Sequence, residues 1–325
     1  MEQVRWGIIG CGNVTEVKSG PALSKVPGSD LVAVMRRNGE KARDYALRHR
    51  VPRWYDDADK LIHDPEVNAV YIATPPSSHA EYTLKAAAAG KPVYVEKPMA
   101  RTYAECQQMI RACEQVGVPL YVAYYRRCLP LFLKVQALLE SGVIGEVRFV
   151  SIRLSMPPLK EDFDRENLPW RVLPDIAGGG YFFDLGSHQL DFLDYIFGPV
   201  VDVHGRAANQ AGLYPAEDIV CAEFTFESGV LGSGVWCFTV SEKDRLDCTE
   251  IVGSQGKIVY ATFDPVPLRL ETSGGVQEYT FEAPAHVQQP LIQTVVDALR
   301  GVGACPSTGV TAARTSWVMD KIVGR

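Results

Sequence analysis

The chain has 325 residues, of which 46% are hydrophobic, and it carries a formal net charge of −6, so it is long enough for a large core and about two domains. Its acidic and basic residues are interspersed, which argues against a nucleic-acid-binding protein, because such proteins present a basic face. No apolar run approaches the roughly 18 residues of a membrane span, and the first residues lack the basic and long apolar regions of a signal peptide.

The first part of the chain, to about residue 123, alternates short apolar runs with helical patterns. This alternation predicts a doubly wound α/β domain, in which helices cover both faces of a parallel sheet. The apolar runs that predict strands are residues 4–10, 31–35, 68–74, 92–98 and 119–125, and the patterns that predict helices are about 13–23, 39–49, 79–90 and 102–117.

The pattern changes after about Tyr124. A helix at about 130–141 leads to an extended run at 146–156, and strands with close turns fill most of 200–281. Strands in series predict an antiparallel or mixed sheet, and two helical patterns close the chain. We therefore expect two tightly packed domains, residues 1–123 and 124–325, with the C-terminal helices packing back.

Eight cysteines are scattered along the chain, and none forms a C-x-x-C pair. Zinc-binding and redox spacings are therefore not predicted. A chain of this length does not need disulfides for its core, and we expect free thiols in a reducing, cytoplasmic compartment.

A glycine turn follows the first predicted strand. Gly10 would permit the tight turn, and Gly12 would let the backbone approach a pyrophosphate at the start of the following helix. Thr15 takes the position where a third glycine is usual. A plain strand-to-helix turn is the alternative, but the surrounding series of strands and helices favours a dinucleotide site.

Two arginines end the second predicted strand. A carboxylate is usual there in NAD sites, where it binds the ribose 2′-hydroxyl, but Arg36 and Arg37 occupy this place. A guanidinium is well matched to phosphate, so we expect NADP(H) to be preferred, with NAD(H) possible and Arg36 as the main ligand, helped by Arg37 or Asn38. The alternative is that the arginines point to solvent or stack on the adenine.

Glu96 and Lys97 follow another predicted strand. Open α/β sheets bind ligands beyond the carboxyl ends of their strands, which makes Lys97 a candidate for catalysis. Pro98 stops the strand and favours an extended conformation at Lys97. The alternative is an ordinary solvated lysine at the protein surface.

A second candidate group lies in the predicted helix after Gly178–Gly180. In a regular helix, Asp184, His188, Asp191 and Tyr195 would form one polar stripe. Three interpretations stay open: a satisfied polar network, a metal site, and acid–base catalysis in which Asp184 orients His188. No cysteine or second histidine cluster supports a metal, and we expect none. The glycines would allow a ligand to approach closely or would form a flexible helix entry.

Four segments together resemble one known family. In chain order they are "GCGNV", "ATPPSSHAEY", "VEKPMA" and "GGGYFFDLGSHQLDFL". With them, essentially the whole chain resembles the glucose–fructose oxidoreductase/inositol dehydrogenase (Gfo/Idh/MocA) family. The resemblance implies an N-terminal Rossmann domain and a C-terminal α/β domain with a large open, mostly antiparallel sheet. It also implies a homodimer or homotetramer that forms through that sheet.

The resemblance also implies site residues. Lys97 matches the lysine of the E-K-P motif, and Asp184 and His188 match the carboxylate and histidine of the family. Tyr124 and Arg126 are expected to line the substrate pocket. Cofactor contacts are implied for Gly10, Gly12, Asn13, Val14, Arg36, Arg37, Thr74, Pro75, His79, Glu96, Lys97, Trp170 and Arg171.

The activity implied is hydride transfer between NAD(P) and a sugar, cyclitol or related hydroxyl or carbonyl compound. His188 would accept the hydroxyl proton, and Lys97 would stabilise charge on the substrate oxygen or donate the proton itself. Two alternatives remain: a glycosidase-like enzyme that uses bound NAD transiently, and a non-catalytic NAD(P) sensor. We expect neither nucleic acid nor a membrane as a partner.

Overall fold

The protein is described by a computed structural model of residues 1–325. The chain forms two compact units, and each unit contains two separate segments. The first unit consists of 1–128 and 283–313, and the second of 129–282 and 314–325.

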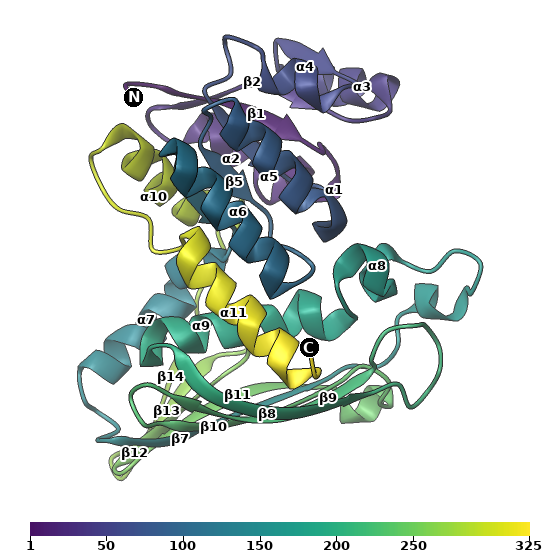
Figure 1. The fold of residues 1–325 in the computed structure, drawn as a ribbon. Helices are drawn as coiled ribbons and strands as arrows, with labels where there is room; N and C mark the ends of the chain where they lie inside the picture. Colours follow the sequence, from purple (N-terminus) through teal and green to yellow (C-terminus); the bar gives the residue numbers. More distant parts are fainter. The chain divides into compact units, whose positions relative to one another are not determined.

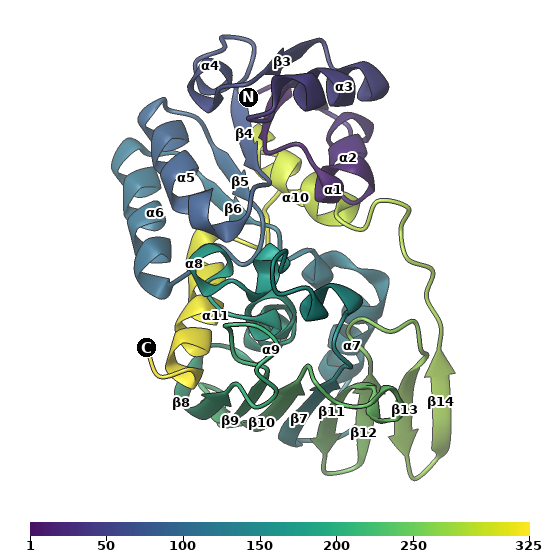
Figure 2. The same cartoon turned by 90° about the vertical axis from the view of Figure 1, so that its right-hand side faces the viewer.

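The first unit is built on a six-stranded parallel sheet in the order β3-β2-β1-β4-β5-β6. Helices cover both faces, with α5 and α6 packed together on one face and α10 beside α2 on the other (Figure 2). The strands are β1 Val4–Ile9, β2 Ser29–Met35, β3 Arg53–Tyr55, β4 Ala69–Ile72, β5 Val93–Val95 and β6 Leu120–Val122. The helices are α1 Asn13–Val17, α2 Gly20–Lys25, α3 Gly39–His49, α4 Ala58–Ile62, α5 His79–Ala88, α6 Tyr103–Val116 and α10 Gln289–Arg300.

The first helical segment differs from the prediction. The pattern predicts one helix to about Leu23, but the structure contains α1 and α2 with a break at Lys18 and Ser19. Pro21 explains the break, because a proline inside a helix lacks an N–H donor and its ring clashes with the preceding turn. Pro21 instead lies in the first turn of α2, where its missing donor costs nothing. The short elements β3 and α4 were not predicted.

Two segments extend the first unit beyond residue 123. Arg127 Nη1 donates to the carbonyl oxygen of Pro306 at 2.5 Å, and Ser307 Oγ donates to the carbonyl oxygen of Val122 at 2.7 Å. These contacts hold the returning segment against the end of β6. The two compact units therefore differ from the predicted domains 1–123 and 124–325, because 124–128 and 283–313 belong to the first unit.

The second unit is built on an eight-stranded sheet in the order β14-β13-β12-β11-β7-β10-β9-β8. Neighbouring strands are antiparallel except β7 and β10, which pair in parallel. Helices α7 and α9 lie on one face of this sheet (Figure 1). The strands are β7 Val147–Ser155, β8 Val200–Ala208, β9 Ile219–Phe226, β10 Leu231–Cys237, β11 Leu246–Gly253, β12 Gly256–Tyr260, β13 Leu268–Thr272 and β14 Gly275–Tyr279, and the helices are α7 Pro130–Glu140, α8 Pro174–Ala177 and α9 Ser187–Phe197.

The final helix, α11, covers Gly309–Ile322 and has residues in both units. Gly205 on β8 allows its last turn to approach the sheet, since a Cβ at Gly205 would lie 2.7 Å from the carbonyl oxygen of Ile322. The two sheets confirm the predicted fold class. None of the helices combines the length and the apolar character needed to cross a membrane.

Candidate active site

The glycine turn joins β1 to α1 beside β4. Gly10 has φ +92°, which favours glycine, and a Cβ there would lie 2.6 Å from Thr74 Cγ2. A Cβ at Gly12 would meet nothing closer than the Gly10 carbonyl oxygen at 3.8 Å. Gly10 is therefore required by the protein itself, whereas the space above Gly12 is open to a ligand.

The start of α1 fits an anionic group. The backbone N–H groups of Asn13 and Val14 stand at the beginning of the helix, where no preceding turn supplies an acceptor. Thr15 is buried, and its hydroxyl accepts a hydrogen bond from the Gly12 N–H at 2.9 Å. These residues therefore suit the pyrophosphate of a dinucleotide, which binds at such helix starts.

The close-packing role of the third glycine is taken by Gly20. A Cβ at Gly20 would lie 2.2 Å from the Thr15 carbonyl oxygen and 2.3 Å from Tyr45 Oη. Tyr45 Oη donates to the same carbonyl oxygen at 2.7 Å, which ties α3 to α1. The glycine motif does not point to Gly20, because Gly20 lies outside the usual spacing.

Arg36 and Arg37 directly follow β2, next to the glycine turn. The backbone N–H groups of Gly10 and Cys11 donate to the carbonyl oxygen of Met35, directly before Arg36. Burial raises the pKa of the Cys11 thiol to about 11, and the charge of Arg36 is the main opposing influence, which places that charge near the turn. Asn38 has a separate task, because its side chain accepts from the Lys41 N–H at 3.0 Å and caps α3.

His79 ties together the loops that follow β4 and β5. It is fully buried, and its Nε2 lies 2.7 Å from the Thr74 carbonyl oxygen. Its Nδ1 lies 3.1 Å and 3.2 Å from the carbonyl oxygens of Pro98 and Met99. Burial lowers the pKa of His79, and the Thr74 carbonyl oxygen opposes that shift. His79 thus holds the Thr74–Pro75 loop against the turn that contains Lys97.

Lys97 follows β5 at the carboxyl edge of the sheet. It is half-buried, and its backbone N–H donates to Oε2 of the buried Glu96 at 3.2 Å. The peptide bond between Lys97 and Pro98 is cis. Tyr124 is fully buried beside the apolar core of this sheet, and the guanidinium of Arg126 lies 5.6 Å from the ring centre of Tyr125.

The second unit carries the other candidates. Arg171 Nε donates to Asp184 Oδ2 at 2.9 Å, and the Arg171 guanidinium lies 4.6 Å from the ring centre of Trp170. His188 is buried, with its ring centre 6.0 Å from that of Phe263. Trp170, Arg171 and Asp184 therefore form a connected group, as does His188 with Phe263.

The prediction of a regular helix from Asp184 onward is wrong. Residues Phe182–Gly186 form a π-helical turn, and α9 begins only at Ser187. A π-turn inserts an extra residue and often marks a functional site. The regular α-helical spacing on which the predicted stripe rests therefore applies only from Ser187 onward.

The acidic residues further along α9 anchor α11. Asp194 is buried, and Arg314 donates to its Oδ2 through both Nε at 2.9 Å and Nη2 at 2.6 Å. Thr315 Oγ1 donates to Asp191 Oδ1 at 3.4 Å. Asp191 thus has a contact that holds two helices together, in line with the interpretation of a satisfied polar network for this part of the stripe.

Two of the three glycines before the π-turn pack against protein groups, and the third ends a helix. A Cβ at Gly179 would lie 2.1 Å from Phe183 Cδ2, and one at Gly180 would lie 2.6 Å from the Glu217 carbonyl oxygen. Gly178 ends α8 with φ +88°. The glycines therefore serve the close approach of aromatic rings and backbone, which neither sequence interpretation anticipated.

The candidate residues thus fall into two groups. The glycine turn, the two arginines, Glu96 and Lys97 belong to the first unit, and the Trp170–Asp184 group and His188 belong to the second. No group of three or more His, Cys, Asp or Glu side chains is arranged to hold a metal ion.

Comparisons with known proteins identify the family. Residues 4–124 match the model of the oxidoreductase family with an NAD-binding Rossmann fold, and residues 132–259 match the GFO/IDH/MocA C-terminal domain. The chain is 40% identical to oxidoreductase P35 of Formosa agariphila over 99% of both chains. It is 31% identical to mouse trans-1,2-dihydrobenzene-1,2-diol dehydrogenase, covering 78% of this chain and 73% of that protein.

A solved structure has the same fold. Levoglucosan dehydrogenase in complex with NADH and levoglucosan superposes with a TM-score of 0.86 at 22% identity, covering 98% of this chain and 96% of that one. The resemblance noted in the sequence is thereby confirmed. The chain belongs to the Gfo/Idh/MocA family of NAD-binding oxidoreductases.

Proposed function

We propose that the protein transfers a hydride between a nicotinamide cofactor and a hydroxyl-bearing carbon of a sugar, cyclitol or related ring alcohol. The observation that carries the proposal is the placement of Lys97 and the glycine turn at one edge of the first sheet. The turn follows β1 and Lys97 follows β5, with β4 between these strands. The strand order reverses next to β1, where such sheets bind ligands.

Each residue has a task in this proposal. The cofactor, when bound, would supply or take up the hydride. Gly12, Asn13 and Val14 would bind its pyrophosphate. Lys97 would donate a hydrogen bond to the substrate oxygen and stabilise the negative charge that develops there. His188 would accept the hydroxyl proton in oxidation and return it in reduction, and the donor could also be Lys97.

The Arg171–Asp184 pair has a supporting role in the proposal. Arg171 Nε holds the Asp184 carboxylate at 2.9 Å, and Asp184 would orient His188 and favour its protonated form. The relatives named above act on a dihydrodiol and on levoglucosan, according to their names. Both names support a cyclic substrate that carries hydroxyl groups.

We further propose NADP(H) as the preferred cofactor, with NAD(H) possible. Arg36 is half-buried and Arg37 is exposed, which leaves both side chains accessible to a phosphate. The cysteine usage supports a reducing, cytoplasmic compartment, because all eight cysteines are free thiols.

A cofactor-coupled screen tests the proposal. Purified protein is mixed with NADP⁺ or NAD⁺ and a panel of sugars, cyclitols and dihydrodiols, and absorbance of the reduced cofactor is followed. We expect net reduction of the cofactor with at least one ring alcohol. Cleavage of glycosides without net cofactor reduction would instead indicate the glycosidase-like alternative. Cofactor binding without any turnover would indicate a sensor.

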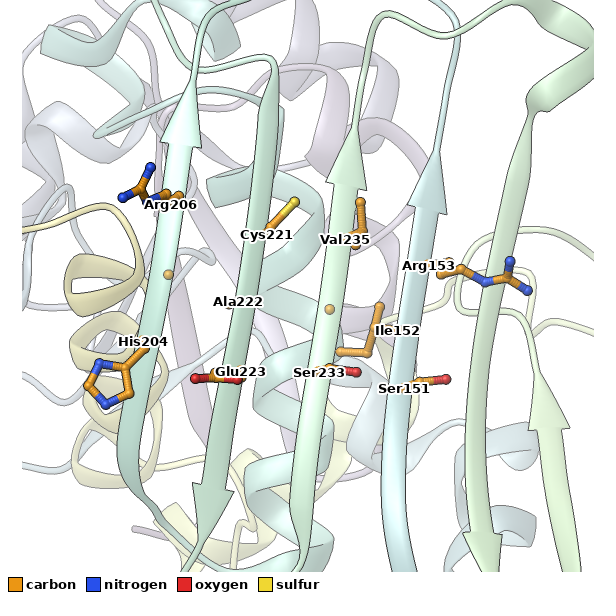
Figure 3. A pocket seen from close by; sticks show the side chains of 12 residues that line it. Ser151, Ile152, Arg153, His204, Arg206, Cys221, Ala222, Glu223, Ser233 and Val235 are labelled. Carbon is orange, nitrogen blue, oxygen red and sulfur yellow. The ribbon is translucent and has the colours of Figure 1, made fainter.

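We also propose that the protein forms a homodimer or homotetramer through the second sheet. One face of this sheet is open, and Phe149, Leu231 and Val235 on it are 44%, 56% and 40% exposed. Their neighbours form a hollow across β7, β8, β9 and β10, with Arg153, Arg206 and Glu223 among its lining residues (Figure 3). A patch with an apolar centre and charged surroundings is typical of a subunit interface.

Charge placed on this open face should separate the subunits. Leu231 lies opposite Phe149 in the parallel pair of β10 and β7, so Leu231→Asp puts a carboxylate beside an exposed aromatic ring. We expect a smaller particle in light scattering. Val302→Asp, at an exposed apolar residue outside the sheet, is the matched control and should leave the mass unchanged. An unchanged mass in Leu231→Asp would refute this interface.

A further inference from the structure

A buried carboxylate lies directly before Lys97. Glu96 Oε1 accepts hydrogen bonds from Tyr71 Oη and from Gln288 Nε2, each at 2.6 Å. Glu96 Oε2 accepts from the Lys97 backbone N–H at 3.2 Å. Hydrogen bonds to an ionised acceptor are the strong ones, and a carboxylate only accepts. The orientation of Glu96 is therefore set by two side chains, and its other oxygen holds the backbone of Lys97.

Tyr71 reaches Glu96 from the adjacent strand β4. It is fully buried, and its ring stacks on Tyr94 with a centroid distance of 4.9 Å. Burial, and then the charge of Glu96, raise the pKa of Tyr71 well above its usual value, so the phenol keeps its proton. Its oxygen also lies 2.9 Å from Ser19 Oγ, between α1 and α2. Tyr71 thus links Glu96 to the segment that follows the glycine turn.

Gln288 reaches the same carboxylate from the far end of the chain. It is fully buried, and Tyr94 Oη donates to its Oε1 at 2.9 Å while its Nε2 donates to Glu96. Its backbone N–H donates to the Lys18 carbonyl oxygen at 3.1 Å, directly after α1. The amide oxygen of Gln288 thus accepts a hydrogen bond and its amide nitrogen donates one. One residue therefore connects the end of α1 with Glu96.

We infer that Tyr71 and Gln288 are positioning residues for Lys97. They fix Glu96, Glu96 fixes the backbone of Lys97, and both also contact the segment after α1. The inference rests on the proposed function for the chemical role of Lys97. Its structural content, that Lys97 responds to changes at Tyr71 and Gln288, can be measured without substrate or cofactor.

The test uses variants that remove hydrogen bonds and keep volume. Tyr71→Phe removes the phenol proton from Glu96, and Gln288→Met removes the amide. Tyr55→Phe is the matched control, because Tyr55 Oη donates to Asp64 Oδ2 at 3.0 Å on the outermost strand of the same sheet, away from Glu96. Circular dichroism checks that each variant folds. Tyr71→Phe and Gln288→Met are the two network variants, and if only one of them folds, that one is sufficient for the test.

The first measurement needs no activity. Lysines are methylated reductively with ¹³C-formaldehyde, and the Lys97 resonance is assigned as the one missing in Lys97→Arg. We expect this resonance to shift in Tyr71→Phe and Gln288→Met and to stay in place in Tyr55→Phe. A Lys97 resonance that is unchanged in both network variants would overturn the inference.

The second measurement uses a substrate from the screen. Misplacing a reacting group costs up to about 100-fold in rate, so we expect kcat to fall roughly 10- to 100-fold, while the cofactor Kd changes by less than about threefold. In a Glu96→Gln background, Tyr71→Phe should have little additional effect, because the coupling passes through that carboxylate. Fully additive losses would overturn the inference. A shifted Lys97 resonance without turnover on any ring alcohol supports it and refutes the proposed function instead.

Discussion

Lys97→Met and His188→Ala are each expected to lower turnover by about 10²- to 10⁴-fold, the usual contribution of acid–base catalysis. Lys97→Met keeps much of the side-chain length but removes the charge and the donors that would act on the substrate oxygen. His188→Ala removes the group proposed to accept the proton. Neither residue lies at the glycine turn, so the cofactor Kd should change little in both variants.

Steady-state kinetics with a substrate from the screen, together with a cofactor titration by fluorescence, checks this expectation. Two exposed residues at α4 provide matched controls: Lys60→Met, whose lysine pairs only with Asp56 at 3.4 Å, and His63→Ala. Both controls should retain near-normal turnover. Near-normal turnover in Lys97→Met and His188→Ala as well would remove both residues from the proposed chemistry.

Comparison of the two variants also shows whether Lys97 or His188 transfers the proton. If His188 transfers the proton, His188→Ala should abolish the rise of kcat with pH that comes from the loss of an imidazole proton. If Lys97 transfers it, a dependence of kcat on pH should remain in His188→Ala, at a lower absolute rate, because the group that exchanges the proton is still present. The pH profile of His188→Ala therefore shows which of the two residues transfers the proton.

The first sheet was predictable from the sequence because its signals are local. Strands β1, β2 and β4 consist mostly of apolar, buried residues, and Gly10 and Gly12 follow β1 at a fixed spacing. The short strand β3 was missed, since its three residues are only partly buried and carry no such run. Helices covering a parallel sheet follow from the connections that parallel strands require.

The π-turn at Phe182–Gly186 could not be predicted in this way. The rings of Phe182 and Phe183 pack on glycines of the same segment, but Phe182 also packs against Trp236 on β10, with ring centres 4.9 Å apart. No spacing within the segment records this distant partner. Spacing arguments that assume regular helix geometry therefore do not apply within this π-turn.

The support of Lys97 was hidden for the same reason. Gln288 and Glu96 are 192 positions apart in the chain, yet their side chains are joined by a hydrogen bond of 2.6 Å. The sequence pattern could identify Glu96 as part of a motif, but only the fold brings Gln288 to it. Residues that hold a site in place are thus harder to find from sequence than residues that form it.

Arg36→Asp is expected to shift the preference from NADP towards NAD. A hydrogen bond to a charged group contributes about 1.5–3 kcal/mol, so losing the guanidinium should weaken NADP binding roughly 10- to 100-fold. The new carboxylate would repel a 2′-phosphate and could accept a hydrogen bond from the 2′-hydroxyl of NAD. Both effects change the ratio of the two affinities in the same direction.

The ratio of kcat/KM for NADP to that for NAD measures this shift, and direct titration of each cofactor measures it without a substrate. Arg37→Asp should have a smaller effect in the same direction, because Arg37 is one residue further from the strand end. Arg43→Asp, an exposed change on α3, makes the same change in net charge and serves as the control. If Arg36→Asp and Arg43→Asp alter the ratio equally, the effect is a general one of charge, and Arg36 does not bind the phosphate.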